Sequence, residues 1–313
     1  MKPVKKNPNR RISPEGNRSR KLITLAVVLI ALIAALLLLE RIKRVHDRTG
    51  KTVPDAEQRH PLPDRGGYAH TEMQPYSTAV SSRLPQRHGK PIKKGTVAII
   101  VDDMGSSLTE AKRLIDINIP LTFAVIPGLA RDREVARLAH ERGYQVMIHT
   151  PMEPHGYPSQ RLEANGLLVS QDDDELSRRF DSYRERVPHA SGTNNHMGSR
   201  FTEDAGKMGV VLKRIREENL FFIDSRTSPH SKGLSIARSM GIPSAGRNVF
   251  LDNVQEPEAI RARLDELASL ARKKGGAIGI CHPHETTVKT LAAELPRMKR
   301  EGITFVLAGD LVR

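Results

Sequence analysis

The feature that most limits the fold of this chain is a regular alternation of short apolar segments with longer amphipathic ones, which begins at Thr96. The apolar segments predict strands over residues 97–101, 121–126, 145–149, 191–195, 220–224, 247–251, 277–281 and 303–307. The segments between them predict helices over residues 109–117, 132–142, 172–186, 204–218, 256–274 and 287–301. Strands that alternate with helices in this way form parallel sheets. About 218 residues with seven or eight such units fit a βα barrel, complete or incomplete, and a flavodoxin-like open sheet is the alternative.

An apolar segment near the amino terminus covers residues 22–39 and contains a single polar residue, Thr24. Eighteen helical residues at 1.5 Å each nearly cross a hydrocarbon layer of ~30 Å, so the segment predicts a transmembrane helix. Residues 1–21 carry more basic side chains than the residues just after the helix, which favours a cytoplasmic amino terminus. A cleaved signal peptide is the alternative, but its apolar core is shorter and ends in small residues, whereas this segment ends in Glu40-Arg41.

The net charge of the chain is +14, and its distribution decides what it means. Residues 1–51 carry a net charge of +10, whereas residues 96–313 carry only +1. A protein that binds nucleic acid needs Lys and Arg on its folded surface, so the distribution argues against a nucleic-acid partner. Residues 40–95 contain several prolines and no sustained apolar pattern, which predicts a disordered linker. The four predicted parts are a basic cytoplasmic segment (1–21), a transmembrane anchor (22–39), a Pro-rich linker (40–95) and a folded domain (96–313).

Acidic residues and histidines stand at the carboxyl ends of the predicted strands, which is where parallel βα folds build their sites. They are Asp102 and Asp103 after the first strand, His149 in the third, His196 after the fourth, Asp224 in the fifth and His282 after the seventh. Any one of the aspartates has an alternative role as a cap of the next helix. Because the topology brings all six residues to one face, together they predict a metal site.

These residue types suggest hydrolysis of an acyl bond. Two imidazoles and a carboxylate hold a divalent metal with one position left open, and the ion lowers the pKa of water. Successive strand residues point in opposite directions, so we expect Asp102 and Asp103 to differ in role, one as a metal ligand and the other as a base. His282, from another strand, is suited to act as a general acid. Cys281, the only cysteine, should point away from His282, which argues against a Cys–His nucleophile pair.

Short motifs in residues 96–313 resemble those of the divergent polysaccharide deacetylases, a family within the carbohydrate-deacetylase superfamily. In chain order, the motifs are IVDDMG (100–105), HTPMEP (149–154), NNHMGSR (194–200), FIDSRT (222–227), VFLDN (249–253) and CHP (281–283). The number and order of the motifs make the resemblance specific. It implies a distorted seven-stranded βα barrel of the glycoside hydrolase/deacetylase type. It also implies zinc-dependent removal of acetyl groups from an envelope glycan.

The resemblance also implies a role for each matching residue. The implied roles are catalytic base for Asp102, metal ligand for Asp103 and His149, and catalytic acid for His282. Ordinary members of the superfamily have a second metal-binding histidine four residues after the first, but here that position is Glu153. We therefore expect His196 to be the third ligand, with Glu153 as the alternative.

Three further residues are expected near the site. The arginine that steadies the catalytic base in the wider superfamily has no equivalent in register here, and Arg200 or Arg247 is expected to take its place. Asp224 is a further candidate for binding the metal or contacting its ligands. Cys281 stands where the divergent family commonly has Gly, which adds bulk near the site but removes no ligand.

Two functions from different classes fit these observations. The first is a metal-dependent deacetylase, with zinc as the expected ion and acetylated polysaccharide as the substrate. It would be a single-pass protein of the bacterial inner membrane, held through residues 22–39, with its catalytic domain periplasmic or otherwise outside the cytoplasm. The second is a glycan-binding or envelope-assembly protein of reduced catalytic ability that keeps the deacetylase barrel. The presence of every expected catalytic residue favours the first.

Overall fold

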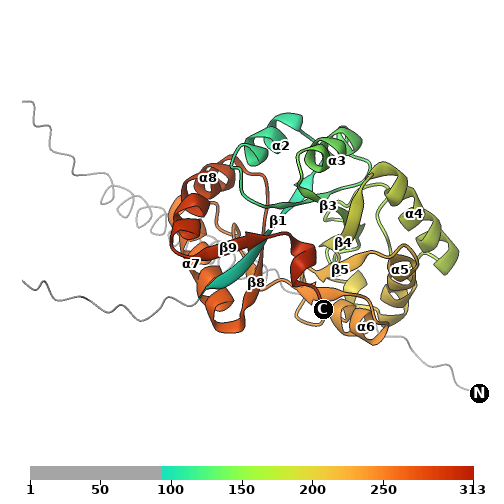
Figure 1. The fold of residues 1–313 in the computed structure, drawn as a ribbon. Helices are drawn as coiled ribbons and strands as arrows, with labels where there is room; N and C mark the ends of the chain where they lie inside the picture. The colour runs from blue at the N-terminus through green and yellow to red at the C-terminus, as the bar shows by residue number, and fades with distance from the viewer. Residues whose placement is uncertain (1–93) are drawn as a thin grey trace, which may run out of the picture. The chain divides into compact units, whose positions relative to one another are not determined.

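The computed structural model describes residues 94–313, in which helices surround a curled sheet of parallel strands (Figure 1). The strands in this part of the chain are β1 (Gly95–Met104), β2 (Thr122–Val125), β3 (Gln145–Met152), β4 (Ala190–Met197), β5 (Phe221–Asp224), β6 (Ser244–Gly246), β7 (Val249–Phe250), β8 (Gly276–Cys281) and β9 (Ile303–Val306). The α-helices are α2 (Leu108–Ile115), α3 (Asp132–Glu141), α4 (Asp173–Arg186), α5 (Ala205–Glu217), α6 (Gly233–Ser239), α7 (Pro257–Lys274) and α8 (Glu285–Arg300). Two 3-10 helices, η1 (Phe201–Glu203) and η2 (Ala308–Leu311), complete the fold.

Three predictions from the sequence concern residues outside this description. The predicted basic segment (1–21), the predicted transmembrane helix (22–39) and nearly all of the predicted linker (40–95) lie beyond the described residues. Among the helices that residues 94–313 form, none is both apolar enough and long enough to cross a membrane.

The order of the strands is that of a barrel that has not closed. The strands follow one another as β6-β5-β4-β3-β2-β1-β8-β7, with β9 on β1, and every pairing is parallel. A flavodoxin-like sheet reverses its strand order at a switch point, whereas here β1 to β6 follow one another across the sheet in chain order. Within residues 94–313, β6 and β7 form the two edges and do not pair with each other. The expectation of a seven-stranded barrel is thus corrected to a nine-stranded half-barrel, because the segment Ser244–Phe250 is divided into two short strands that pair with different neighbours, β6 with β5 and β7 with β8.

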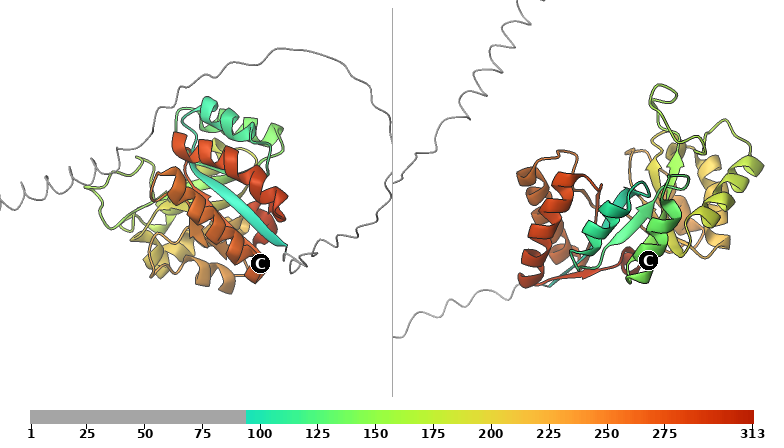
Figure 2. Two further views of the ribbon diagram at one scale, coloured as in Figure 1. Left: turned by 90° about the vertical axis from the view of Figure 1, so that its left-hand side faces the viewer. Right: turned by 90° about the horizontal axis from the view of Figure 1, so that it is seen from above.

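The sheet separates a large outer core from a small inner one. In β1, Val97, Ile99 and Val101 belong to the outer cluster that the helices cover, while Ala98 and Ile100 belong to the inner cluster. This division follows from the two-residue period of a strand. Figure 2 shows helices on the outside of the curl from two directions. The inner core also includes residues of β2, β3, β5, β8 and η2.

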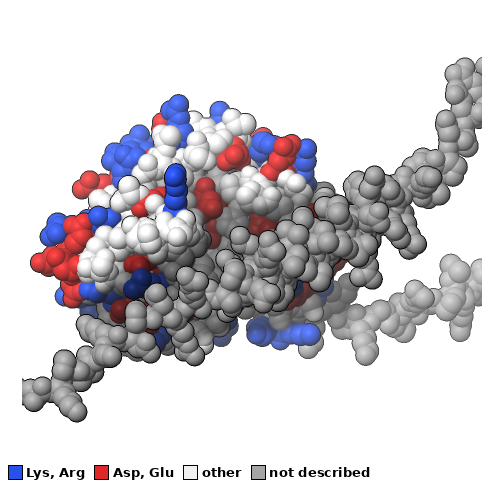
Figure 3. Space-filling model, turned by 180° about the vertical axis from the view of Figure 1, so that it is seen from behind, with Lys and Arg blue, Asp and Glu red and all other residues white. Residues whose placement is uncertain are grey.

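Three helices begin at residues whose side chains cap the first turn. The side chains of Ser107, Asp172 and Asp204 accept hydrogen bonds from backbone N–H groups at the starts of α2, α4 and α5. At the other end, α7 stops at Gly275, whose φ of 84° lies in the left-handed region that glycine tolerates. On the face seen in Figure 3, acidic and basic side chains are intermixed, in keeping with the near-neutral charge expected for this domain.

Candidate active site

The site residues lie on the inner side of the sheet because they continue the inward-facing rows of the strands. Three site residues each follow an inner-core residue by two positions: Asp102 follows Ile100, His149 follows Met147 and His282 follows Ile280. Asp102 and His149 are almost completely buried, whereas the side chain of His282 is 21% exposed. The alternation that builds the core therefore also brings the predicted acids and imidazoles together.

Asp103 reaches the same cluster by a departure from regular strand geometry. By alternation it would point away from Asp102, but its φ is 55° and the pairing of β1 with β2 shifts register between Val101 and Met104. Such a left-handed backbone is uncommon for a residue other than glycine and tends to occur at functional sites. As a result, Asp103 Oδ1 lies 3.2 Å and Asp102 Oδ2 lies 3.5 Å from Nε2 of His149. Both carboxylates therefore face one imidazole, which the alternation of strand residues did not predict.

Three ligand atoms converge in a triangle. His196 Nδ1 lies 2.8 Å from Asp103 Oδ1 and 3.2 Å from His149 Nε2, and the third side, between Asp103 Oδ1 and His149 Nε2, is 3.2 Å. Asp103 Oδ1 is buried, yet no well-directed hydrogen bond reaches it from any described residue. Two imidazoles and a carboxylate are the donors that zinc and similar divalent ions prefer. The three side chains therefore fit a metal ion.

Asn194 fixes the orientation of two members of the cluster. His149 Nδ1 lies 2.8 Å from Asn194 Oδ1 and donates to it, so the lone pair of His149 Nε2 faces the triangle. Asn194 Nδ2 donates to Asp102 Oδ1 at 2.8 Å and to Ser225 Oγ at 3.2 Å. One buried amide thus couples the predicted base to a predicted metal ligand.

The charges within the cluster shift several pKa values. Burial raises the pKa of Asp102, and the charges of His149 and His282 only partly offset this effect. Burial also opposes ionisation of Asp103, but its contacts with His149 and His196 hold its pKa well below the usual range. Burial disfavours the charged form of His149, but the neighbouring carboxylates outweigh it and raise the pKa of His149 to about 9. The cluster therefore attracts positive charge, whether as protons or as a metal ion.

His282 is held by a buried carboxylate of its own. Its backbone N–H donates to Asp252 Oδ2 at 2.7 Å, and its Nδ1 lies 3.2 Å from Asp252 Oδ1. Thr287 Oγ1 also donates to Asp252 Oδ2, at 3.0 Å. Burial disfavours imidazolium, but the hydrogen bond to Asp252 and nearby carboxylates raise the pKa of His282. Its Nε2 faces the cluster, 3.8 Å from Asp103 Oδ2, so a proton on this atom is available at the site.

Glu153 and Arg200 are not brought to the cluster. Glu153 Oε1 accepts a hydrogen bond from Arg200 Nη1 at 2.8 Å, and Oε2 accepts one from the backbone of Val169 at 2.7 Å. Both carboxylate oxygens of the alternative third ligand are thus engaged in holding the segment that follows β3. That segment projects beyond the sheet in Figure 2.

Asp224 and Arg247 lie beside the cluster without joining it. The carboxylate of Asp224 accepts hydrogen bonds from the backbone of Arg226 and Leu234 and from the hydroxyl of Ser231, so it shapes the loop after β5. Arg247 Nε donates to the carbonyl oxygen of Ser225 at 2.7 Å. Burial lowers the pKa of Arg247, and the charge of Asp102 acts against this shift. Neither of the two arginines expected to steady the base forms a hydrogen bond or ion pair with Asp102 among the described residues: Arg200 bonds to Glu153, and Arg247 to the backbone after β5.

Three residues of the site were not singled out from the sequence. Asn194 and Asp252 lie inside the NNHMGSR and VFLDN motifs. The motifs therefore included both residues but did not indicate which side chains they contact. Glu163 lies in the segment between β3 and α4, where no pattern marks it. Its Oε2 is buried and lies 3.6 Å from His196 Nε2, on the side of the imidazole away from the triangle.

Comparison with known sequences identifies the family of the chain. Residues 99–312 match the sequence profile described as divergent polysaccharide deacetylase. The chain belongs to the divergent polysaccharide deacetylase family. This divergent polysaccharide deacetylase domain is 35% identical over 222 residues to the uncharacterized protein YibQ of Escherichia coli (strain K12), covering 71% of this chain and 69% of that protein. It is 33% identical over 217 residues to an uncharacterized protein of Haemophilus influenzae, covering 69% of this chain and 76% of the relative.

A solved structure shows the same fold. The crystal structure of the uncharacterized protein ATU2773 from Agrobacterium tumefaciens C58 is similar with a TM-score of 0.67 and 24% sequence identity. The match covers 72% of this chain and 92% of that one. The curled half-barrel is therefore also the fold of an experimentally determined protein.

Proposed function

We propose that the protein is a metal-dependent deacetylase that hydrolyses acetyl groups of a cell-envelope polysaccharide. The observation that carries the proposal is the convergence of Asp103 Oδ1, His149 Nε2 and His196 Nδ1 within 3.2 Å of one another. A base, Asp102, and an acid, His282, stand beside the same triangle. Family membership supports the substrate class, and the donor set supports zinc as the ion.

The residues divide the work of hydrolysis between them. Asp103, His149 and His196 hold the ion, which when bound polarises an acetyl carbonyl and makes water more acidic. Asp102 accepts a proton from the water that attacks the acetyl carbon, and Asn194 holds the carboxylate in place. His282 Nε2 then donates a proton to the departing nitrogen or oxygen of the sugar as the acyl bond breaks.

The exposure of the four side chains indicates the side from which the substrate approaches. The side chains of Asp103 and His282 are 36% and 21% exposed, whereas those of Asp102 and His149 are 4% and 2% exposed. The acetyl group therefore meets the cluster from the side of Asp103 and His282. The buried base stays shielded from bulk water, where its raised pKa makes it the stronger proton acceptor.

The place of the protein in the cell is part of the proposal. The apolar segment 22–39 and its basic flank support a single-pass anchor in the inner membrane, with the amino terminus in the cytoplasm and the catalytic domain in the periplasm. Recovery of the chain in the membrane fraction, and its release after deletion of residues 22–39, checks this part. Recovery of the intact chain among soluble proteins would contradict it.

Acetate release tests the activity. We expect the full chain, loaded with zinc, to release acetate from an N-acetylated or O-acetylated glycan in a broad panel, and we expect a chelator to stop it. Asp103→Asn should lower the rate by at least about a hundredfold, because loss of even an outer contact to a metal ligand costs ~10–100-fold. Asp174→Asn, an exposed carboxylate on α4, is the matched control and should keep full activity.

Two outcomes would contradict the proposal. One is the absence of acetate release from every glycan by folded, zinc-loaded protein. In that case, retained binding of glycan would identify a carbohydrate-binding protein of reduced catalytic ability. The other is equal loss of activity in Asp103→Asn and Asp174→Asn, which would separate the activity from the cluster.

A further inference from the structure

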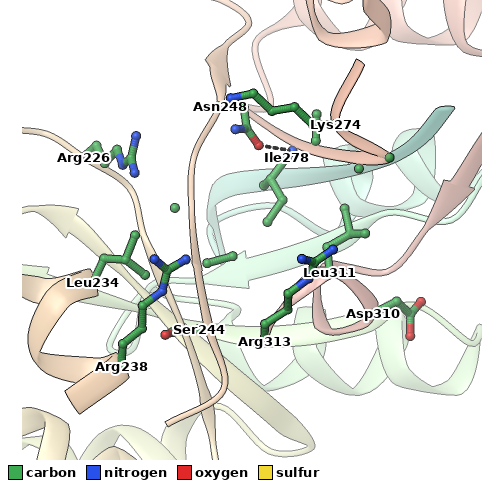
Figure 4. Close-up of a pocket in the computed structure, with 15 residues that line it drawn as sticks. Arg226, Leu234, Arg238, Ser244, Asn248, Lys274, Ile278, Asp310, Leu311 and Arg313 are labelled. Atoms are coloured by element: carbon green, nitrogen blue, oxygen red, sulfur yellow. Dashed lines mark hydrogen bonds between the residues drawn. The ribbon is translucent and has the colours of Figure 1, made fainter. Parts of the chain in front are cut away.

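The unclosed seam of the half-barrel contains a cavity. It lies between β6 and the start of β8, which do not pair although residues 247 and 248 carry the chain directly from β6 to β7, and its volume is about 340 Å³ (Figure 4). β7 covers β8 only at Gly279 and Ile280, so the stretch that begins at Gly276 has no strand beside it on this edge. None of the residues proposed to act in deacetylation lines the cavity. The cavity is therefore separate from the candidate active site.

The lining of the cavity is strongly cationic. Arg226, Arg238, Lys274 and Arg313 border it, and Asp310 is the one acidic residue among the lining side chains. Figure 4 shows these cations arriving from separate elements around one space. None of the four forms an ion pair with any residue in the range 94–313. The lining side chains thus place four positive charges around a single carboxylate, that of Asp310.

The backbone of Arg226 is fixed by contacts within the chain. Its φ of 52° is in the left-handed region, and its backbone N–H donates to Asp224 Oδ1 at 2.8 Å. Its side chain lies so close to β6 that a Cβ on Gly246 would be 2.7 Å from Arg226 Nε. Strained, closely packed geometry of this kind persists where the surrounding structure imposes it, often at ligand sites. The backbone of Arg226 is thus held in place, and its exposed side chain passes close to Gly246 of β6.

A buried hydroxyl independently points to a ligand. Ser244 is 1% exposed and lines the cavity, and its Oγ has no hydrogen-bond partner among the described residues. A buried polar atom without a partner costs free energy, so such atoms usually meet a ligand or water. Asn248 uses its Oδ1 to accept from the backbone of Ile278 at 2.8 Å, which leaves its amide group as a further donor at the cavity.

We propose that this cavity binds the phosphate group of a small phosphate ester such as a sugar phosphate. Three guanidinium groups, an ammonium group and a hydroxyl exceed what a monocarboxylate can engage, whereas a phosphate dianion offers three oxygens to such donors. The volume is at the lower end of the range for small-molecule sites, which leaves room for an organic group of sugar size. A second cavity of about 540 Å³ adjoins the first, because Arg226, Leu234 and Arg238 line both.

Titration calorimetry of the full chain at physiological salt tests the proposal, with glucose 1-phosphate, inorganic phosphate and glucose as separate ligands. We expect glucose 1-phosphate to bind more tightly than phosphate, and glucose to show no binding. Arg238→Gln should weaken binding of glucose 1-phosphate about tenfold, the loss of one charge-assisted hydrogen bond. Gly246→Ala should weaken it by a similar factor, because the new Cβ displaces Arg226.

The matched control is Arg216→Gln, which removes an exposed, unpaired arginine of α5 that lines neither cavity. It should leave the affinity unchanged, and the thermal midpoint of Arg238→Gln should equal that of the parent. Failure of both phosphate ligands to bind would overturn the proposal. So would equal weakening by Arg216→Gln and Arg238→Gln, which would show attraction to the overall charge. Because no acetylated glycan is present, neither result depends on deacetylation.

Discussion

Replacement of Asp102 by asparagine is expected to lower the rate of acetate release by about 10²–10⁴-fold and to leave zinc affinity within a few-fold of the parent. Asparagine keeps the size of the side chain and still offers one oxygen to Asn194 Nδ2, so the fold and the triangle of ligands should survive. It cannot accept a proton. The loss should therefore fall on kcat rather than on metal content, and both are measured on the same preparation.

This pattern distinguishes a base from a ligand. If Asp102→Asn lost zinc as completely as Asp103→Asn does, Asp102 would be a metal ligand and the assigned roles would be reversed. Activity within tenfold of the parent would mean that another group removes the proton. Asp174→Asn, with both activity and zinc content unchanged, controls for handling of the variants.

Replacement of His282 by glutamine is expected to cost about 10²–10⁴-fold in kcat, because the leaving group then departs without a proton.

Replacement of Asp252 by asparagine should change the dependence of kcat on pH. Asp252 helps to raise the pKa of His282, and an acid works only while it is protonated, so activity is lost as pH rises through that pKa. Without the carboxylate the pKa falls. The alkaline limb of the profile of kcat against pH should therefore move to lower pH.

The pH profile separates this role from a structural one. Asp252→Asn keeps an oxygen for the backbone N–H of His282 and for Thr287 Oγ1, so the strand end should remain in place. A purely structural loss would lower kcat by the same factor at every pH. An unchanged alkaline limb, or one that moved to higher pH, would contradict the assignment of His282 as the acid.

The fold could be predicted from the sequence wherever apolar periodicity is strong. Each predicted strand and helix has a counterpart in the structure, because β-branched runs such as 97–101 and amphipathic stretches such as 256–274 leave few alternatives. The elements missed were β6, α6 and the two 3-10 helices, η1 and η2. β6 is only Ser-Ala-Gly, with no β-branched residue, and α6 is seven residues long. Both are held by contacts distant in sequence, such as that of Ser244 with Arg313, and such contacts leave no local pattern.

The candidate site was predictable to the extent that it follows strand alternation. Asp102, His149 and His282 continue inward-facing rows, so their convergence follows from topology. The position of Asp103 depends on a left-handed backbone and a register shift that no pattern of residue types specifies. The choice of His196 over Glu153 near the triangle likewise depends on tertiary contacts, since Arg200 and Val169 engage the glutamate.

Zinc binding by the full chain is the most direct test of the central claim, that Asp103, His149 and His196 form one metal site. Equilibrium dialysis should give one zinc ion per chain. His196→Gln should weaken binding by at least about a hundredfold, while Glu153→Gln and the control His155→Gln, an exposed histidine, should retain it. Unchanged zinc binding in His196→Gln, or loss of zinc in Glu153→Gln with the fold intact, would contradict the assignment of these three ligands.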